Sequence, residues 1–467
     1  MNELLSASYV SSFDISRTGD SIVYARNSRD GRSLHLLLRN TSATYDDHTV
    51  AAEDGTYESL MLTGDGRKLI YLRDNNGDEK FDIFMCSIEE CGNSFRLTDK
   101  INLTPDTDFS ILRGISQDEA GRRIAFVSNR DGNFASYFLG TTDGKTKRIS
   151  THGYSDDAAV ISPDGKKVAV SYGRYGQDGA ITVYSTGDDS DSMELLHEGQ
   201  PVDAGSPCRL GDSRHIAFSS NSGEFGRIGI MDTADGSLNW VSGTDEDLSH
   251  PVVATLSGVI ACLREGGTDR VPAVLVPGLT NNTVSPDNLQ GLCFDIRIDA
   301  GGKSLFMLME TASEPANLCM VETGSGKHYR LSHSFPHGSI AATFINARAV
   351  SYMSEFDGMM IPALIYVPEH AEQRGPAVVS IHGGPTWKSY NGWQPLIQGL
   401  VSCGVTVLCQ NYRGSSGYGR SFRDANRFLM GMADLADCAS AWKYLVDSGL
   451  AGERRVAVAG DSFGGYH

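Results

Sequence analysis

VAVAGDSFGG, at residues 456–465, joins an apolar run to a turn in which a serine stands between two glycines. Ser462 lies two positions after Gly460 and two before Gly464, which matches the G-x-S-x-G spacing of a nucleophile elbow. Such a turn needs small residues at both places, because its backbone is strained and neighbouring elements pass close to it. The spacing therefore predicts a strand that ends at an exposed, nucleophilic serine.

The residues before this turn alternate between strand and helix patterns. Ala377–Ile381, Val405–Cys409 and Val456–Ala459 are continuous apolar runs, which are typical of strands buried on both faces of a sheet. Between the last two runs, apolar residues recur at helical spacing, at Leu435, Cys438, Ala439, Trp442, Leu445 and Val446. Gly449 can end this helix in a left-handed conformation. Strand, helix and strand in this order predict a parallel sheet with flanking helices, as in an α/β-hydrolase domain.

A glycine loop follows the first of these apolar runs. His382-Gly-Gly-Pro385 stands at the exit of the strand, where a glycine N–H can help to hold the oxyanion of a tetrahedral intermediate. The second donor would be the backbone N–H of Phe463. We expect His382 to orient this loop by hydrogen bonding and not to transfer a proton.

A different pattern repeats through the first three quarters of the chain. A turn, a polar pair and an apolar run recur, with turns near residues 19, 66, 121, 165, 213, 258 and 302, so that successive copies are 44 to 55 residues apart. This period is close to that of propeller blades, and each copy reads as short hairpin strands. Residues 1–350 are therefore predicted to form an all-β seven-bladed propeller, with a β-sandwich of coincidental spacing as the weaker alternative. Residues 351–467 are assigned to the hydrolase domain.

Composition limits the classes of partner. The chain has 467 residues and a formal charge of −18, which disfavours nucleic acid and anionic membranes because both need basic surface. The N-terminus lacks the basic and apolar regions of a signal peptide, and no run approaches the length of a membrane span, so we expect a cytoplasmic protein. Nine cysteines without zinc or redox spacing are expected to be free, mostly buried thiols. No metal or cofactor is expected, and the oligomeric state is unknown.

Five motifs in the second part of the chain together resemble one known family. They are residues 356–358 (FDG), 361–368 (IPALIYVP), 382–385 (HGGP), 411–419 (NYRGSSGYG) and the Ser462 elbow. This set is similar to that of the prolyl oligopeptidase family, and most of all to its acylaminoacyl-peptidase and dipeptidyl-peptidase-like branch. The resemblance implies a serine peptidase whose propeller restricts access to short peptide substrates. It also implies that Ser462 is acylated, with the N–H groups of Gly384 and Phe463 as the oxyanion hole.

The general base is the missing part of this pattern. In an α/β-hydrolase the catalytic residues follow the order Ser, then Asp or Glu, then His, yet only five residues follow Ser462. His467, on the helix that leaves the elbow, is expected to point away from the serine. We therefore expect a C-terminally truncated fragment that holds the N-terminal half of the hydrolase domain and is inactive.

Three questions stay open from the sequence. A carboxylesterase could use the same elbow and glycine loop, and a non-catalytic propeller interaction protein could retain both as remnants. Arg413 could contact substrate, or it could brace the sheet edge through a carboxylate such as Asp434 or Asp437. The residue preferred at the scissile bond, and exopeptidase against endopeptidase action, are not readable.

Overall fold

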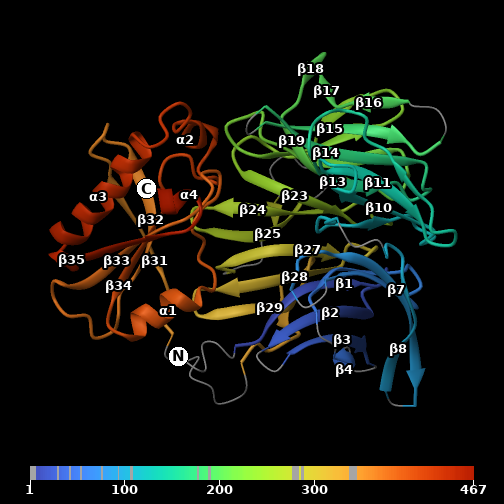
Figure 1. Ribbon diagram of the computed structural model, residues 1–467, viewed down its shortest axis with the longest axis horizontal. Coiled ribbons are helices and arrows are strands. Elements are labelled where there is room, and N and C mark those ends of the chain that lie inside the picture. The colour runs from blue at the N-terminus through green and yellow to red at the C-terminus, as the bar shows by residue number, and fades with distance from the viewer. Residues whose placement is uncertain are drawn as a thin grey trace.

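The computed structural model describes most of the chain. The described residues are 7–28, 31–40, 44–52, 55–74, 77–92, 94–105, 109–175, 178–187, 191–275, 283–284, 289–335 and 344–466. Two parts are distinct in Figure 1: a large assembly of small sheets, and a smaller part in which helices flank a single sheet.

Within the described residues, the first part contains seven antiparallel units of four strands. The first three are β1–β4 (Tyr9–Ile15, Ser21–Ser28, Gly31–Arg39, Tyr45–Ala52), β5–β8 (Tyr57–Leu62, Lys68–Arg73, Asp82–Cys91, Ser94–Asn102) and β9–β12 (Ser116–Gln117, Arg123–Ser128, Ala135–Gly140, Thr146–Arg148). The fourth and fifth are β13–β16 (Asp156–Ile161, Lys167–Tyr175, Asp178–Ser185, Ser192–Glu194) and β19–β22 (Ala204–Arg209, His215–Ser220, Arg227–Asp232, Leu238–Trp240). A short hairpin of β17 (Leu196–His197) and β18 (Gln200–Pro201) lies between these two in the chain.

The last two units are β23–β26 (Asp247–Val253, Ile260–Gly266, Asp269–Leu275, Thr283–Val284) and β27–β30 (Leu292–Ile298, Ser304–Thr311, Glu314–Glu322, His328–Arg330). One parallel pair, Arg270 with Leu292, joins them into a single continuous sheet.

Buried apolar clusters hold the seven units in a ring. Each of seven clusters takes its side chains from two units that follow one another in the chain, or from the last and the first. The cluster that closes the ring packs Phe13 and Tyr24 of the first unit against Phe306 and Leu318 of the seventh, and Figure 1 shows β1–β3 beside β28 and β29. Sheets that bury both faces against their neighbours around a ring form a β-propeller, and we number its blades 1 to 7 in chain order.

The repeated turns are the most regular feature of these blades. Each one connects the first and second strands of a blade, and its residue at position 19, 66, 121, 165, 213, 258 or 302 has a φ between 57° and 74°. Glycine adopts this left-handed conformation without strain, which explains its presence at six of the seven turns. Ser213, in a degenerate copy, adopts the same conformation at φ 57°. Residues 129–133 form a hairpin turn within one of these copies, since Ser128 pairs with Ala135 across it.

The second part is a five-stranded sheet in the order β31-β32-β34-β33-β35. The parallel strands are β34 (Thr406–Gln410), β33 (Gly375–Ile381) and β35 (Ala451–Gly460), at the places that the apolar runs predicted. β35 is not buried on both faces as expected, because it is the last strand of the described sheet and most of its residues are exposed. Two strands that the sequence pattern did not reveal, β31 (Arg348–Met353) and β32 (Met360–Tyr366), pair antiparallel at one edge. The sheet is therefore mixed.

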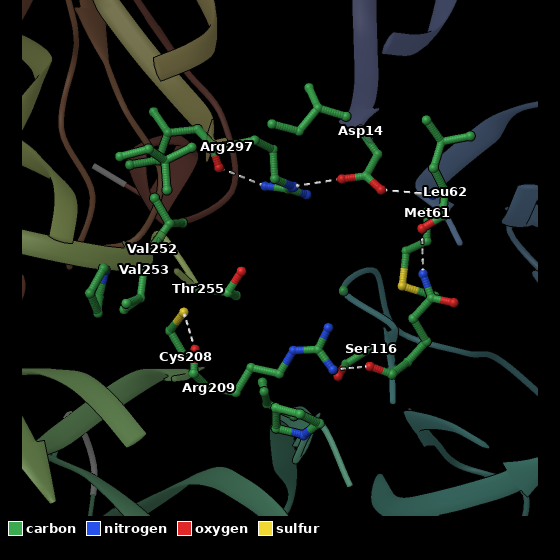
Figure 2. A pocket seen from close by; sticks show the side chains of 18 of the residues that line it. Asp14, Met61, Leu62, Ser116, Cys208, Arg209, Val252, Val253, Thr255 and Arg297 are labelled. Carbon is green, nitrogen blue, oxygen red and sulfur yellow. Dashed lines mark hydrogen bonds and ion pairs between the residues drawn. The ribbon is translucent and has the colours of Figure 1, made fainter. Parts of the chain in front are cut away.

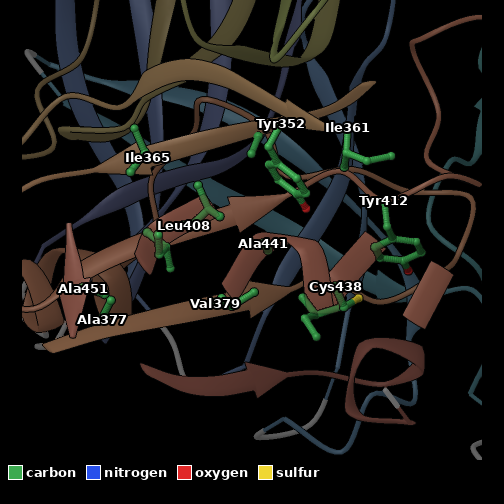
Figure 3. Packing of buried hydrophobic residues seen from close by; sticks show 13 residues of the cluster. Tyr352, Ile361, Ile365, Ala377, Val379, Leu408, Tyr412, Cys438, Ala441 and Ala451 are labelled. Atoms are coloured by element: carbon green, nitrogen blue, oxygen red, sulfur yellow. The ribbon is translucent and has the colours of Figure 1, made fainter. Parts of the chain in front are cut away.

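Helices cover both faces of this sheet. α3 (Ala433–Asp447) packs Cys438, Ala441 and Leu445 on one face, against residues that include Val379 and Leu408. Figure 3 shows Cys438 and Ala441 in this cluster. α1 (Pro395–Ser402) packs Ile397 and Val401 on the other face. Two short helices, α2 (Arg420–Asp424) and α4 (Phe463–Tyr466), complete the described part. This is the layering of an α/β domain.

The buried face of α3 differs from a purely apolar stripe. Leu435 and Trp442 are exposed, while Asp434 and Asp437 are fully buried. The reason is that this face also supplies hydrogen-bond acceptors: Asp437 binds Arg413, and Asp434 accepts the backbone N–H of Gly431. Gly449 has a φ of 72° after the helix, as expected for its cap.

The two parts are in direct contact. Blades 4 to 7 each contact the second part, which is the predicted hydrolase domain. The contacts are an ion pair of Asp178 with Arg427, a hydrogen bond from Ser421 to Glu224, an ion pair of Glu265 with Lys388, and a hydrogen bond from Gln398 to the carbonyl of Ala312. Among the described residues, no helix is long and apolar enough to cross a membrane. All nine cysteines are free thiols, and five of them are buried.

Candidate active site

Ser462 occupies a strained turn between β35 and α4. Its φ of 49° places a side-chain-bearing residue in the left-handed region, which costs on the order of 1 kcal/mol or more and persists only where the surroundings impose it. β35 ends at Gly460 and α4 begins at Phe463, so the serine stands between a strand and a helix. This is the geometry expected of a nucleophile elbow.

Two glycines make this turn possible. A Cβ on Gly460 would lie 2.1 Å from the carbonyl oxygen of Gly464, and a Cβ on Gly464 would lie 2.3 Å from that of Ile381. Both obstacles are backbone atoms, which cannot move aside as a flexible side chain can. The requirement for small residues on each side of Ser462 therefore has a direct steric cause.

The glycine loop lies against the elbow. β33 ends at Ile381, and a Cβ on Gly383 would lie 3.1 Å from the Cβ of Ser462 and 3.1 Å from Oδ2 of Asp461. Gly384 has a φ of 132°, a conformation that favours glycine. The structure thus brings together the two motifs that the sequence separates by about 80 residues. That the N–H groups of Gly384 and Phe463 form the oxyanion hole stays a prediction.

His382 is held inside the loop by its neighbours. Its Nδ1 lies 2.7 Å from the carbonyl oxygen of Gly383, and its Nε2 lies 2.9 Å from Oγ of Ser415. Its ring stacks on Tyr412 with centroids 4.5 Å apart, and the Tyr412 hydroxyl donates to the His382 carbonyl. Both ring nitrogens are thus engaged by the fold, which favours the orienting role over proton transfer.

Arg413 braces the sheet edge. Its guanidinium is 1% exposed and donates to both oxygens of Asp437, at 2.8 Å each, and to both oxygens of Asp357, at 2.8 and 2.9 Å. Hydrogen bonds from Arg413 lower the pKa of Asp357 below its ordinary value. Of the two carboxylates considered from the sequence, Asp437 is the partner and Asp434 is not. Asp357 was missed, although it belongs to the FDG motif at residues 356–358.

His467, the histidine that follows the elbow, lies outside the described residues. Within the described part of the chain, no histidine or carboxylate makes a hydrogen bond to Ser462. The same part holds no group of three or more His, Cys, Asp or Glu side chains that could bind a metal ion.

The described architecture is a propeller joined to an α/β sheet that carries a strand–elbow–helix serine with a glycine loop beside it. The model of the prolyl oligopeptidase family matches residues 393–467, which include the elbow. The resemblance to this family is thereby confirmed.

Curated relatives share the same region. Acylamino-acid-releasing enzyme 2 of Oryza sativa subsp. japonica is 32% identical over 111 residues, which cover 24% of this chain and 14% of that enzyme. Dipeptidyl peptidase family member 6 of Caenorhabditis elegans is 36% identical over 89 residues, which cover 19% of this chain and 12% of that protein. These alignments span only a small part of the relatives' own lengths.

Solved structures match over almost the whole chain. A puromycin-hydrolyzing peptidase of Mycobacterium tuberculosis superposes with a TM-score of 0.79 at 17% identity, covering 99% of this chain and 75% of that one. The acylaminoacyl peptidase of Pyrococcus horikoshii gives a TM-score of 0.69 at 16% identity, covering 98% of this chain and 74% of that one. At these identities the likeness establishes a shared fold, a propeller joined to a hydrolase domain.

Proposed function

We propose that this protein acts as a serine peptidase on short peptides, through an acyl-enzyme formed on Ser462. The observation that supports this most is the strained Ser462 turn with Gly383 packed against it, because it sets a nucleophile beside a glycine loop suited to oxyanion binding. In this proposal the propeller forms the cap and the α/β part is the catalytic domain, which begins before the expected boundary at residue 350 because β31 (Arg348–Met353) belongs to its sheet. Gly384 and Phe463 supply the oxyanion hole.

The propeller is proposed to limit the size of the substrate. A cavity of about 700 Å³ is lined by residues of all seven blades, so it lies on the axis of the ring. Arg209 and Arg297 extend into it (Figure 2). Arg209 of blade 5 donates to the carbonyl oxygen of Gln117 on blade 3, and Arg17 of blade 1 lies 2.8 Å from Glu119, also from blade 3. These contacts between blades that are not neighbours narrow the central opening of the propeller, which supports the exclusion of folded proteins.

The test measures the hydrolysis of amide and ester substrates by the natural protein. It should release a chromophore from short peptide amides, leave folded proteins intact, and lose the peptidase activity in Ser462→Ala. Hydrolysis of short-chain esters alone would favour the carboxylesterase alternative. Failure to cleave either substrate would favour a propeller interaction protein without catalysis.

A further inference from the structure

The loop that follows the glycine motif is held by the propeller. In the stretch between the end of β33 at Ile381 and the start of α1 at Pro395, residues 388–393 contact blades 6 and 7. Figure 1 shows that β24, β25 and β28 each have one end toward the hydrolase domain. The segment 388–393 makes ion pairs or hydrogen bonds to both blades.

A buried ion pair is the centre of this contact. Nζ of Lys388 lies 2.6 Å from Oε2 of Glu265 on blade 6, and it also donates to the carbonyl oxygen of Gly267 at 2.8 Å. The two side chains are 0% and 8% exposed, and Arg270 pairs with the other oxygen of the Glu265 carboxylate. Burial on its own raises the pKa of Glu265, but Lys388 and Arg270 outweigh it, so the pKa lies below its ordinary value and the carboxylate is charged.

Further bonds fix the same segment. The Asn391 N–H donates to the Thr268 carbonyl at 2.9 Å, and the Asn391 side chain donates to Asp269 at 2.9 Å. On blade 7, Glu310 accepts the N–H of Trp393 at 3.1 Å. The segment is therefore attached to the propeller at several successive positions and cannot shift without breaking them.

The hydrolase domain holds this segment from the other side. The Ser389 N–H donates to Asn411 at 2.6 Å, and the N–H of Ser416 donates to the Trp387 carbonyl at 3.1 Å. A Cβ on Gly417 would lie 2.4 Å from Nζ of Lys388, so this glycine leaves the space that the ammonium group fills. Lys388 is thus enclosed by both domains, and it lies only four residues after Gly384.

We propose that Glu265 is a positioning residue for the reaction at Ser462: its ion pair with Lys388 fixes the loop that carries Gly384 against the elbow. This inference rests on the proposed peptidase function. Glu265 touches neither the substrate nor Ser462, and it acts through Lys388 and the chain that leads back to Gly384. A residue of the propeller thereby helps to form the oxyanion hole of the other domain. In this account, docking of the propeller is part of assembling the catalytic site.

The experiment compares Glu265→Gln with Glu246→Gln in the natural protein. Glu246 is the control because it is a glutamate of the same blade whose ion pair, 3.2 Å long, is with Arg264 of that blade. Glu265→Gln should lower kcat for a short peptide amide by about tenfold or more with KM changed less than about threefold, since oxyanion stabilisation acts on the transition state. Glu246→Gln should leave both constants unchanged. Lys388→Met, which removes the pair from the hydrolase side, should reproduce the loss.

Hydrogen exchange separates this inference from the peptidase function. In Glu265→Gln and Lys388→Met, amides of residues 382–393 should exchange faster than in the wild type, while those of blade 3 should not change. If the wild type cleaves no peptide, the peptidase proposal fails, and exchange alone still shows whether Glu265 holds the loop. A normal kcat in Glu265→Gln, an equal loss in Glu246→Gln, or unchanged exchange over 382–393 would overturn the positioning role.

Discussion

Glu265 of the propeller and Lys388 of the hydrolase domain form an ion pair 2.6 Å long from which water is almost excluded. A buried pair of this kind is costly to break from one side, because the remaining charge is left without a partner. Glu265 and Lys388 are 123 residues apart in the chain, yet the pair stands close to the glycine loop. The interface between the two domains is thus a structural part of the candidate active site.

The glycines of the elbow give a steric prediction. Gly460→Ala should destabilise the fold by about 1–3 kcal/mol, because its new methyl group meets the Gly464 carbonyl at 2.1 Å. Gly465→Ala is the control, since the nearest atom to its Cβ lies 3.4 Å away. Thermal unfolding of both variants checks this. Equal melting temperatures for the two would contradict the geometry.

Glu310 predicts a pH dependence of stability. Burial raises its pKa from 4.5 to about 7, opposed only by the N–H of Trp393. The folded protein therefore binds a proton that the unfolded chain releases, and stability falls as pH rises from about 4.5 to 7. At about 1.4 kcal/mol per pKa unit the full change is about 3 kcal/mol.

Glu310→Gln should remove this loss. The variant should be more stable than the wild type at pH 8 and close to it at pH 5, as measured by urea unfolding at the two pH values. Glu369→Gln, at an exposed position, serves as the control and should follow the wild type. If the wild type instead gains stability over Glu310→Gln between pH 5 and pH 8, the predicted direction of the pH dependence is wrong.

Arg413 should not be replaceable by lysine. Arg413→Lys keeps a positive charge but cannot donate in pairs to both Asp357 and Asp437, so we expect a loss of about 2–4 kcal/mol in the free energy of unfolding. Arg454→Lys, on an exposed position of β35, should change stability little. A neutral Arg413→Lys would show that the bidentate bonds are not what holds this edge.

Replacement of His382 distinguishes a role in orienting the loop from a role in proton transfer. If it orients the loop, His382→Asn should lower kcat by about tenfold through displacement of the loop and leave the pKa of the acidic limb of the pH–rate profile unchanged. The measurement is kcat/KM for a peptide amide between pH 5 and 9. Disappearance of that limb in His382→Asn would instead assign the general base to this residue.

Local patterns predicted the parts of the fold that depend on local chemistry. Six of the seven turns follow from glycine at left-handed positions, and β33, β34 and β35 follow from continuous apolar runs. The strands β31 and β32 were missed because Ser351 and Pro362 lie within short segments whose pattern does not distinguish an antiparallel edge. Their pairing is decided by the neighbouring sheet.

Contacts between distant residues could not be predicted. Nothing in the segment around Glu265 marks it as the partner of Lys388, since a charged residue in a hairpin is ordinarily solvated. Gly417 is visible in the motif at residues 411–419, but the sequence does not show why a glycine is needed there. Its role is to leave room for the side chain of Lys388. In the same way, the burial of Asp437 on α3 makes sense only once Arg413 is placed.

Covalent labelling of Ser462 tests the central claim most directly. The natural protein would be treated with a fluorophosphonate, digested, and analysed by mass spectrometry, with Ser462→Ala as the control. We predict a single adduct on Ser462 that appears in parallel with the loss of peptide hydrolysis. Peptide hydrolysis that persists in Ser462→Ala, or an adduct on a different serine that accompanies the loss of activity, would contradict the assignment of Ser462 as the nucleophile.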